Sequence, residues 1–149
     1  MNPFKRLRIP IIVLAAAWLA GCATTAPQVM VTIADARVHE AENVDIGAAG
    51  DSPGDMYVFD QPLLDAQGQA IGNNSGVCIR SRVAHSLQCQ WTLTLDDGTI
   101  QVAGREFDKG ASDITIVGGS GVYSGISGHM ESVNNDDGTF TQTLYYRLK

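Results

Sequence analysis

The sequence has few positively charged side chains. Ten Lys and Arg residues stand against sixteen Asp and Glu residues, which gives a net charge of −6. An acidic surface repels the phosphates of nucleic acids and of anionic lipid headgroups, so we expect no nucleic-acid partner and no electrostatic membrane binding. After position 22 the chain also lacks a sustained 3.6-residue apolar period, an internal repeat and a second-domain boundary. These absences argue against a helical bundle and favour one domain.

Long hydrophobic runs are absent as well, apart from Ile9 to Leu19, which is too short to span a bilayer as a permanent helix. Lys5, Arg6 and Arg8 precede this run, which is the layout of a secretory signal. The run ends in LAGC, which resembles the bacterial lipobox, in which the cysteine becomes the lipidated N-terminus of the mature protein. Cys22 is therefore the predicted site of lipid attachment.

The resulting prediction is a cleaved lipoprotein signal peptide at 1–21, a lipidated tether at 22–28 and one domain at 29–149. Removal of the leader takes away three positive charges and no negative one, so the net charge of −6 becomes −9. Acyl chains on Cys22 are then the expected means of membrane attachment. We expect a lipid-anchored protein of the bacterial cell envelope, and Ala23 resembles the pattern that directs such proteins to the outer membrane or the cell surface.

Cysteine is otherwise rare. In an exported protein, Cys78 and Cys89 favour a disulfide over a free catalytic thiol. Two cysteines without a CxxC spacing do not indicate a zinc site, and His39, His85 and His129 lie in separate segments. We therefore predict no metal site and no cofactor.

The mature chain consists instead of short alternating apolar runs bounded by Gly, Asp and Asn, which predict an all-β domain. WTLTLDDGTIQVAG predicts a hairpin with a turn at Asp97-Gly98 and with Leu95 opposite Ile100. Further strands are expected at 29–34, 38–46, 56–64, 114–117, 127–133 and 139–148. About eight strands with short polar connections indicate a closed antiparallel barrel or a sandwich.

The two cysteines also predict the register of the preceding hairpin. Bridged cysteines on neighbouring antiparallel strands normally lie directly opposite each other. Placing Cys78 opposite Cys89 centres the turn on Val83 and Ala84. Closing so short a loop is expected to stabilise the fold by about 3 kcal/mol in the chain-entropy model.

The same register brings Arg80 to the face that carries Trp91. If this face is directed inward, burial of an unpaired guanidinium there would destabilise the fold by on the order of several kcal/mol. Asp60 on a neighbouring strand is an available partner, and the pair could orient a carboxylate or polarise a carbonyl group. The alternatives without a functional role are that a bulge turns Arg80 to solvent or that the pair only stabilises the fold.

Residues 118–128, GGSGVYSGISG, contain five glycines but no lysine, so they do not form a Walker loop. The segment also lacks a following helix that could meet a pyrophosphate. The glycines instead predict positive φ angles and close backbone approach at a barrel corner. Tyr123 within this segment could line a pocket or pack under the corner.

Three segments together resemble a known family. GDMYVFDQPLLDAQGQAIGNNSGVC, LDDGTIQVAG and ITIVGGSGVYSGISGHM are similar in order and spacing to the allene oxide cyclase and dirigent barrels. The resemblance implies an eight-stranded antiparallel closed barrel whose lumen takes small apolar molecules. It places Phe59 and Gln61 in the lumen and puts Cys78 at a pocket-lining position. For the acidic residue of the plant site, Glu40 and Glu42 are the candidates.

Two functions follow from this resemblance. The favoured one is a non-catalytic module that binds a small apolar molecule or has a structural role near the envelope. The alternative is a cyclase or isomerase that confines an unsaturated or lipid-like substrate in the lumen. The candidate lumen residues are Phe59, Asp60, Gln61, Arg80, Trp91 and Tyr123. Barrels of this family often associate, so a homo-oligomer is compatible with the sequence.

Overall fold

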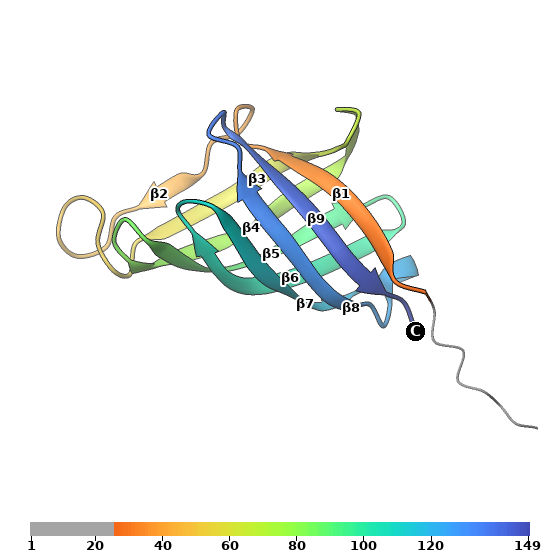
Figure 1. The fold of residues 1–149 in the computed structure, drawn as a ribbon. Coiled ribbons are helices and arrows are strands. Elements are labelled where there is room, and N and C mark those ends of the chain that lie inside the picture. Colours follow the sequence, from red (N-terminus) through yellow and green to blue (C-terminus); the bar gives the residue numbers. More distant parts are fainter. Residues whose placement is uncertain (1–25) are drawn as a thin grey trace, which may run out of the picture.

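The structure, a computed structural model, describes residues 26–149 and consists almost entirely of β-strands (Figure 1). The predicted signal peptide 1–21, Cys22 and most of the predicted tether lie outside the described residues. Within residues 26–149, no helix has the length and apolar character needed to cross a membrane. The elements are β1 (Gln28–Asp35), β2 (Glu42–Val44), β3 (Met56–Asp65), β4 (Ala70–Arg82), β5 (Ser86–Leu95), β6 (Gly98–Phe107), β7 (Ala111–Gly119), the 3-10 helix η1 (Gly121–Tyr123), β8 (Ser127–Asn134) and β9 (Thr139–Arg147).

All the strands except β2 form a closed antiparallel barrel. They follow the order β1-β9-β8-β7-β6-β5-β4-β3, and the second edge of β1 pairs with β3 to close the sheet. The short β2 pairs with the first residues of β3. The predicted eight-stranded closed barrel is therefore confirmed, and the sandwich is excluded. Among the described residues, the strand pairings involve residues 28–147, and these residues close the barrel.

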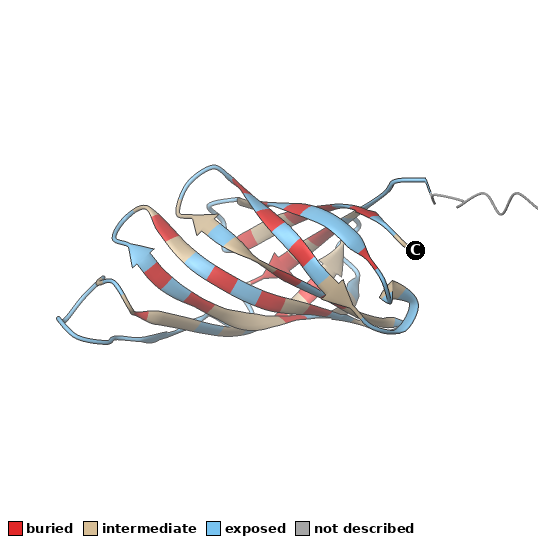
Figure 2. Cartoon of the chain, turned by 90° about the horizontal axis from the view of Figure 1, so that it is seen from below, coloured by how far each residue is buried: buried red, intermediate tan, exposed pale blue. Residues whose placement is uncertain are grey.

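Side chains alternate between the lumen and the outside along each strand, as the banded colouring in Figure 2 shows. In β6, for example, Ile100 and Val102 are buried, whereas Gln101 between them is exposed. The apolar core fills the half of the lumen next to the start of β1, which we call the closed end. Its fully buried members include Leu63, Leu93, Ile100, Ile114, Met130 and Leu144.

The β5–β6 hairpin is present, but its register differs from the prediction by two residues. Leu95 pairs with Gly98 instead of Ile100, so the turn residues are Asp96 and Asp97. Gly98 belongs to the strand because its missing side chain lets the carbonyl of Ser120 approach, where a Cβ would clash. A shift of two residues leaves every side chain on its predicted face.

The glycine-rich segment covers the closed end of the barrel. Gly121 has a φ of 60°, and a Cβ there would clash with the carbonyl oxygen of Asp97. A Cβ on Gly119 would lie 2.7 Å from the carbonyl oxygens of Thr99 and Tyr123. The glycines thus supply left-handed backbone and close approach at a barrel corner, as the sequence predicts.

Cys78 and Cys89 lie opposite each other on β4 and β5 and form the predicted disulfide. Two positions away on the same lumen face, Gly76 lies opposite Trp91. A Cβ on Gly76 would clash with both the backbone and the Cβ of Trp91. The glycine of the GVC motif therefore makes room for the indole ring.

The turn after β4 is longer than predicted. The register shifts between Arg80 and Arg82, and the connecting loop is Val83–His85 instead of a turn centred on Val83 and Ala84. This bulge leaves Arg80 buried in the lumen and Arg82 exposed. A bulge is thus present, but it lies beyond Arg80 and turns only the second arginine to solvent.

The predicted strand at 38–46 is mostly wrong, because only Glu42–Val44 pairs with β3. The buried Asp55 carboxylate accepts hydrogen bonds from the backbone N–H of Ile46 (2.9 Å) and of Ser52 (2.7 Å). These bonds fold the chain after β2 into a loop around Asp55. The sequence pattern could not show this competing set of side-chain acceptors.

Candidate functional site

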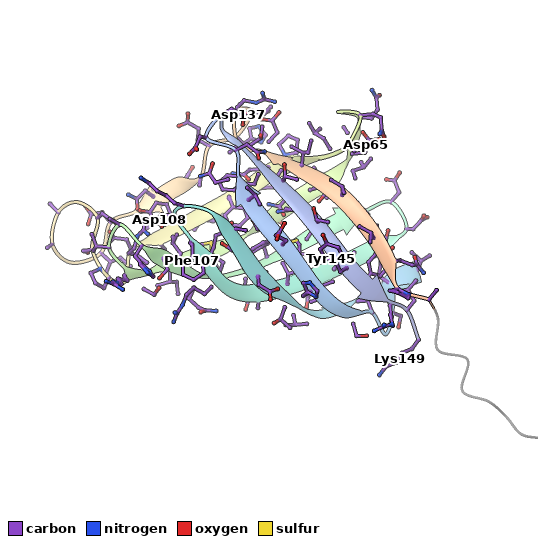
Figure 3. All side chains as sticks on the ribbon, viewed as in Figure 1. Asp65, Phe107, Asp108, Asp137, Tyr145 and Lys149 are labelled. Atoms are coloured by element: carbon purple, nitrogen blue, oxygen red, sulfur yellow. A yellow bond between two sulfur atoms is a disulfide. The ribbon has the colours of Figure 1, made fainter. Side chains whose placement is uncertain are left out.

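The half of the lumen away from the closed end is hollow. It contains a cavity of about 700 Å³, which opens between the connections that follow β1, β6 and β8. We call this opening the mouth. Figure 3 shows Asp108 and Asp137 at this end of the barrel and Lys149 at the opposite end. A cavity of this volume suits one small organic molecule.

Aromatic side chains from four strands form much of the cavity wall. Tyr57 and Phe59 come from β3, Trp91 from β5, Phe107 from β6 and Phe140 from β9. The rings of Phe59 and Trp91 meet edge to face with their centroids 6.4 Å apart. The Trp91 Nε1 is buried and has no hydrogen-bond partner within residues 26–149. Such a wall offers flat apolar faces to a ligand.

A small polar group lies between the aromatic wall and the apolar core. The Thr32 hydroxyl donates to Oε1 of Gln142 (3.1 Å), and Nε2 of Gln142 donates to Oδ1 of Asn74 (3.3 Å). Gln61 also lines the cavity and is 5% exposed, so the structure places it where the resemblance implied. These amides offer both donors and acceptors at the inner end of the cavity.

An acidic residue that the sequence analysis missed, Glu106, also lines the cavity. Its Oε1 accepts a hydrogen bond from the Ser132 hydroxyl at 2.7 Å, and a carboxylate oxygen lies within 4.8 Å of the sulfurs of Cys78 and Cys89. The partial exposure of Glu106 is toward the cavity. Burial raises the pKa of Glu106, and the bond from Ser132 only partly offsets this effect. Because the two sulfurs are bonded to each other, they do not act as metal ligands beside it.

The alternation of β6 contained the signal for Glu106. Ile100 and Val102 face the lumen, so Gly104 and Glu106 must face it too. Of the acidic candidates considered from the sequence, Glu40 lines the mouth of the cavity, whereas Glu42 is exposed on β2.

Arg80 lies in the lumen near the mouth, but its partners are not the one expected. Its Nε donates to Asp51 (2.7 Å) and its Nη1 to Asp108 (2.6 Å), while its Cζ lies 5.5 Å from the ring centroid of Tyr57. Burial alone would lower the pKa of Arg80, but Asp108, Tyr57 and Asp51 outweigh it and raise the pKa. The side chain is thus a paired cation that ties two loops to the barrel wall.

Asp60, the expected partner of Arg80, is on the outside of the barrel. It is exposed and accepts a hydrogen bond from Nδ2 of Asn73 at 3.0 Å. The physical reason is strand alternation: because Phe59 and Gln61 face the lumen, the residue between them points outward. The prediction of Asp60 as a lumen residue is therefore wrong.

The remaining candidates are spread over the molecule. Tyr123 is partly buried in η1 and packs against the core at the closed end, so it does not line the cavity. His85 packs edge to face against Phe107 in the mouth region, and His129 stacks on Tyr145 on the outer face. The Nδ1 of His39 lies 3.2 Å from the carbonyl oxygen of Asp60. The three histidines therefore do not converge.

This fold and cavity define a class. Residues 36–143 match the model of the allene oxide cyclase barrel-like domain, and the chain belongs to this family. No curated protein sequence matches the chain.

Solved structures of the same fold include a pyocyanin demethylase, with 22% identity over 81% of this chain and 99% of that one, and a TM-score of 0.67. The Diels Alderase AbmU from Streptomyces koyangensis has 22% identity over 87% and 72% of the two chains, with a TM-score of 0.67. The pterocarpan synthase dirigent protein PsPTS1 has 16% identity over 85% and 98%, with a TM-score of 0.64. At these identities the likeness concerns the fold.

The raised pKa of Glu106 predicts a pH-dependent effect of Glu106→Gln on stability. Folding favours the protonated carboxyl, so its contribution is fully present at low pH and is lost as the pH rises from the unfolded pKa through the folded one. The variant keeps an acceptor for Ser132 but carries no charge. We expect a higher Tm than wild type at pH 7.5 and no difference below about pH 4.

Thermal melts followed by circular dichroism across this pH range measure the effect. Glu131→Gln is the matched control, because Glu131 is exposed on β8 next to Ser132. A Glu106→Gln variant that is less stable than wild type at pH 7.5 would show that the carboxylate stabilises the barrel.

Proposed function

We propose that this protein is a lipid-anchored envelope protein whose barrel binds a small apolar molecule in its lumen. The observation that carries the proposal is the cavity of about 700 Å³ with aromatic walls and a few fixed polar groups. Sites for small molecules commonly combine these features. A barrel of structural role alone would be expected to fill its lumen with side chains along its whole length.

The position of the start of β1 supports an anchored carrier. Gln28 begins β1 at the closed end, near the end of β9, as Figure 1 shows. A lipidated Cys22 would therefore hold the closed end toward the membrane, within about 20 Å because six residues reach no further. The mouth would face away from the bilayer, so the ligand would be exchanged with the surrounding compartment.

Lipid attachment is tested by metabolic labelling with radioactive palmitate. We expect the wild-type chain to incorporate label and Cys22→Ala to incorporate none. The matched control is the double variant Cys78→Ala/Cys89→Ala, which loses the disulfide but should remain labelled. Equal labelling of Cys22→Ala would contradict the anchor.

Binding in the lumen is tested with the neutral fluorophore N-phenyl-1-naphthylamine and the barrel of residues 26–149. Leu87 lines the cavity opposite Glu106, whereas its neighbour Gln88 is exposed on the outer face. We expect Leu87→Trp to weaken binding by about fivefold or more, because the indole ring narrows the lumen. The packed barrel can widen to make room only at a cost in free energy.

The control Gln88→Trp adds the same ring outside the barrel and should bind as wild type does. Thermal melts confirm that both variants are folded. Absence of saturable binding by the wild-type barrel, or equal weakening by both variants, would exclude a lumen site.

A second function, cyclisation or isomerisation by confinement, is favoured by Glu106. A carboxyl with a raised pKa can give a proton to one atom of a bound molecule and recover one from another, so no co-reactant is consumed. The names of the structural neighbours include a Diels Alderase and a pterocarpan synthase, but fold alone does not transfer their activities.

This second function predicts that Glu106→Gln binds the lumen ligand yet fails to convert it. Molecules extracted from the purified Glu106→Gln protein are incubated with wild type and with the variant, and the products are separated by chromatography with mass detection. A new species of unchanged mass that only the wild type produces is the expected result. An unaltered ligand with both proteins would leave the barrel as a carrier.

A further inference from the structure

The charged side chains around the cavity are predominantly acidic. Glu40, Glu106, Asp108 and Asp137 line it, and the cations in the lining are Arg37 and Arg80. Whether these two arginines are available to a ligand decides which charge the lumen accepts.

Both arginines already have carboxylate partners. Arg37 binds Asp35 through two parallel contacts of 2.8 Å, Nε to Oδ1 and Nη2 to Oδ2. Arg80 is shared between Asp51 and Asp108 and also lies over the ring of Tyr57. A ligand carboxylate would have to displace one of these partners, so neither guanidinium offers a ready anion site.

In contrast to the two arginines, Glu106 forms no ion pair within residues 26–149. The Ser132 hydroxyl is its hydrogen-bond donor. An anionic ligand beside it would force the carboxyl to remain protonated, whereas a cationic ligand would allow it to ionise and would supply the missing counter-charge.

The aromatic wall favours the same kind of ligand. The rings of Phe59 and Trp91 border the cavity, and Phe107 follows Glu106 directly in the chain. Aromatic faces attract cations as well as flat apolar rings. A planar cation can therefore contact the rings with its surface and the carboxylate with its charge.

We propose that the lumen selects cationic and neutral planar aromatic molecules over anionic ones, and that Glu106 is the side chain that makes this distinction. The inference rests on the proposed function and specifies its ligand class. It also separates this barrel from a binder of free fatty acids, whose carboxylate would meet an acidic mouth and then Glu106.

The test uses three probes with one tricyclic skeleton: N-methylacridinium as the cation, acridine as the neutral form and acridine-9-carboxylate as the anion. Affinities for the 26–149 barrel are measured by fluorescence titration at pH 7.5 in 0.15 M salt. We expect the cation to bind about tenfold more tightly than the anion, as one additional close charge contact allows, with acridine between them.

Glu106→Gln should reduce the cation-to-anion ratio to about two or less while acridine affinity changes by less than about twofold. Glu131→Gln removes the same charge from the outer face and should preserve the ratio. The ratio should also persist in 0.5 M salt, because an enclosed contact is screened less than a surface field.

The outcomes separate the two proposals. If the three probes bind equally, or if the anion binds best, the charge selection is overturned and the binding function stands. If the ratio survives in Glu106→Gln or disappears in 0.5 M salt, the overall negative charge causes it and the assignment to Glu106 is overturned. If none of the three probes binds but N-phenyl-1-naphthylamine does, the ligand class is overturned and the binding function stands. If N-phenyl-1-naphthylamine does not bind either, the proposed function itself fails.

Discussion

The pairing of β1 with strands on both of its sides is the constraint on which the rest of the structure depends. Residues 32–34 pair with β9 on one side and with β3 on the other, and this closes the sheet. Closure removes the free edges and fixes which positions face inward on every strand. An eight-stranded barrel is wide enough to be filled by side chains or to hold one small ligand. In this barrel, side chains fill the lumen at one end and leave a ligand-sized cavity at the other.

The division of the lumen follows from side-chain size along single strands. In β8, the fully buried Met130 is followed at the next inward position by Ser132, and in β6 the buried Val102 is followed by Gly104 and then Glu106. In these two strands, small or polar side chains therefore follow a large apolar one on the way to the mouth. A cavity forms because the protein does not fill this space, while the packed half supplies the stability that a hollow half lacks.

Strand alternation and the disulfide could be read from the residues themselves, and the disulfide register placed Trp91 and Arg80 on one face. The closed barrel and the lumen positions of Phe59 and Gln61 came from the resemblance to the allene oxide cyclase and dirigent barrels. The outward direction of Asp60 and the inward direction of Glu106 follow from the same alternation, so the sequence contained both signals. The partners of Arg80 could not be predicted in this way. Asp51 and Asp108 lie in loops, 29 and 28 residues away in the chain, and only the folded barrel brings them together. Periodicity describes strands and says little about loops that meet across a mouth.

Arg80 and Glu106 show two different treatments of a charge inside one lumen. Arg80 has two carboxylates and an aromatic face, so its burial is compensated. Glu106, in contrast, accepts a hydrogen bond from the Ser132 hydroxyl, and burial raises the pKa of Glu106. A glutamine at this position would accept the same hydrogen bond without the desolvation of a charge. An uncompensated carboxylate that faces a cavity is therefore better explained by what enters the cavity than by what holds the barrel together.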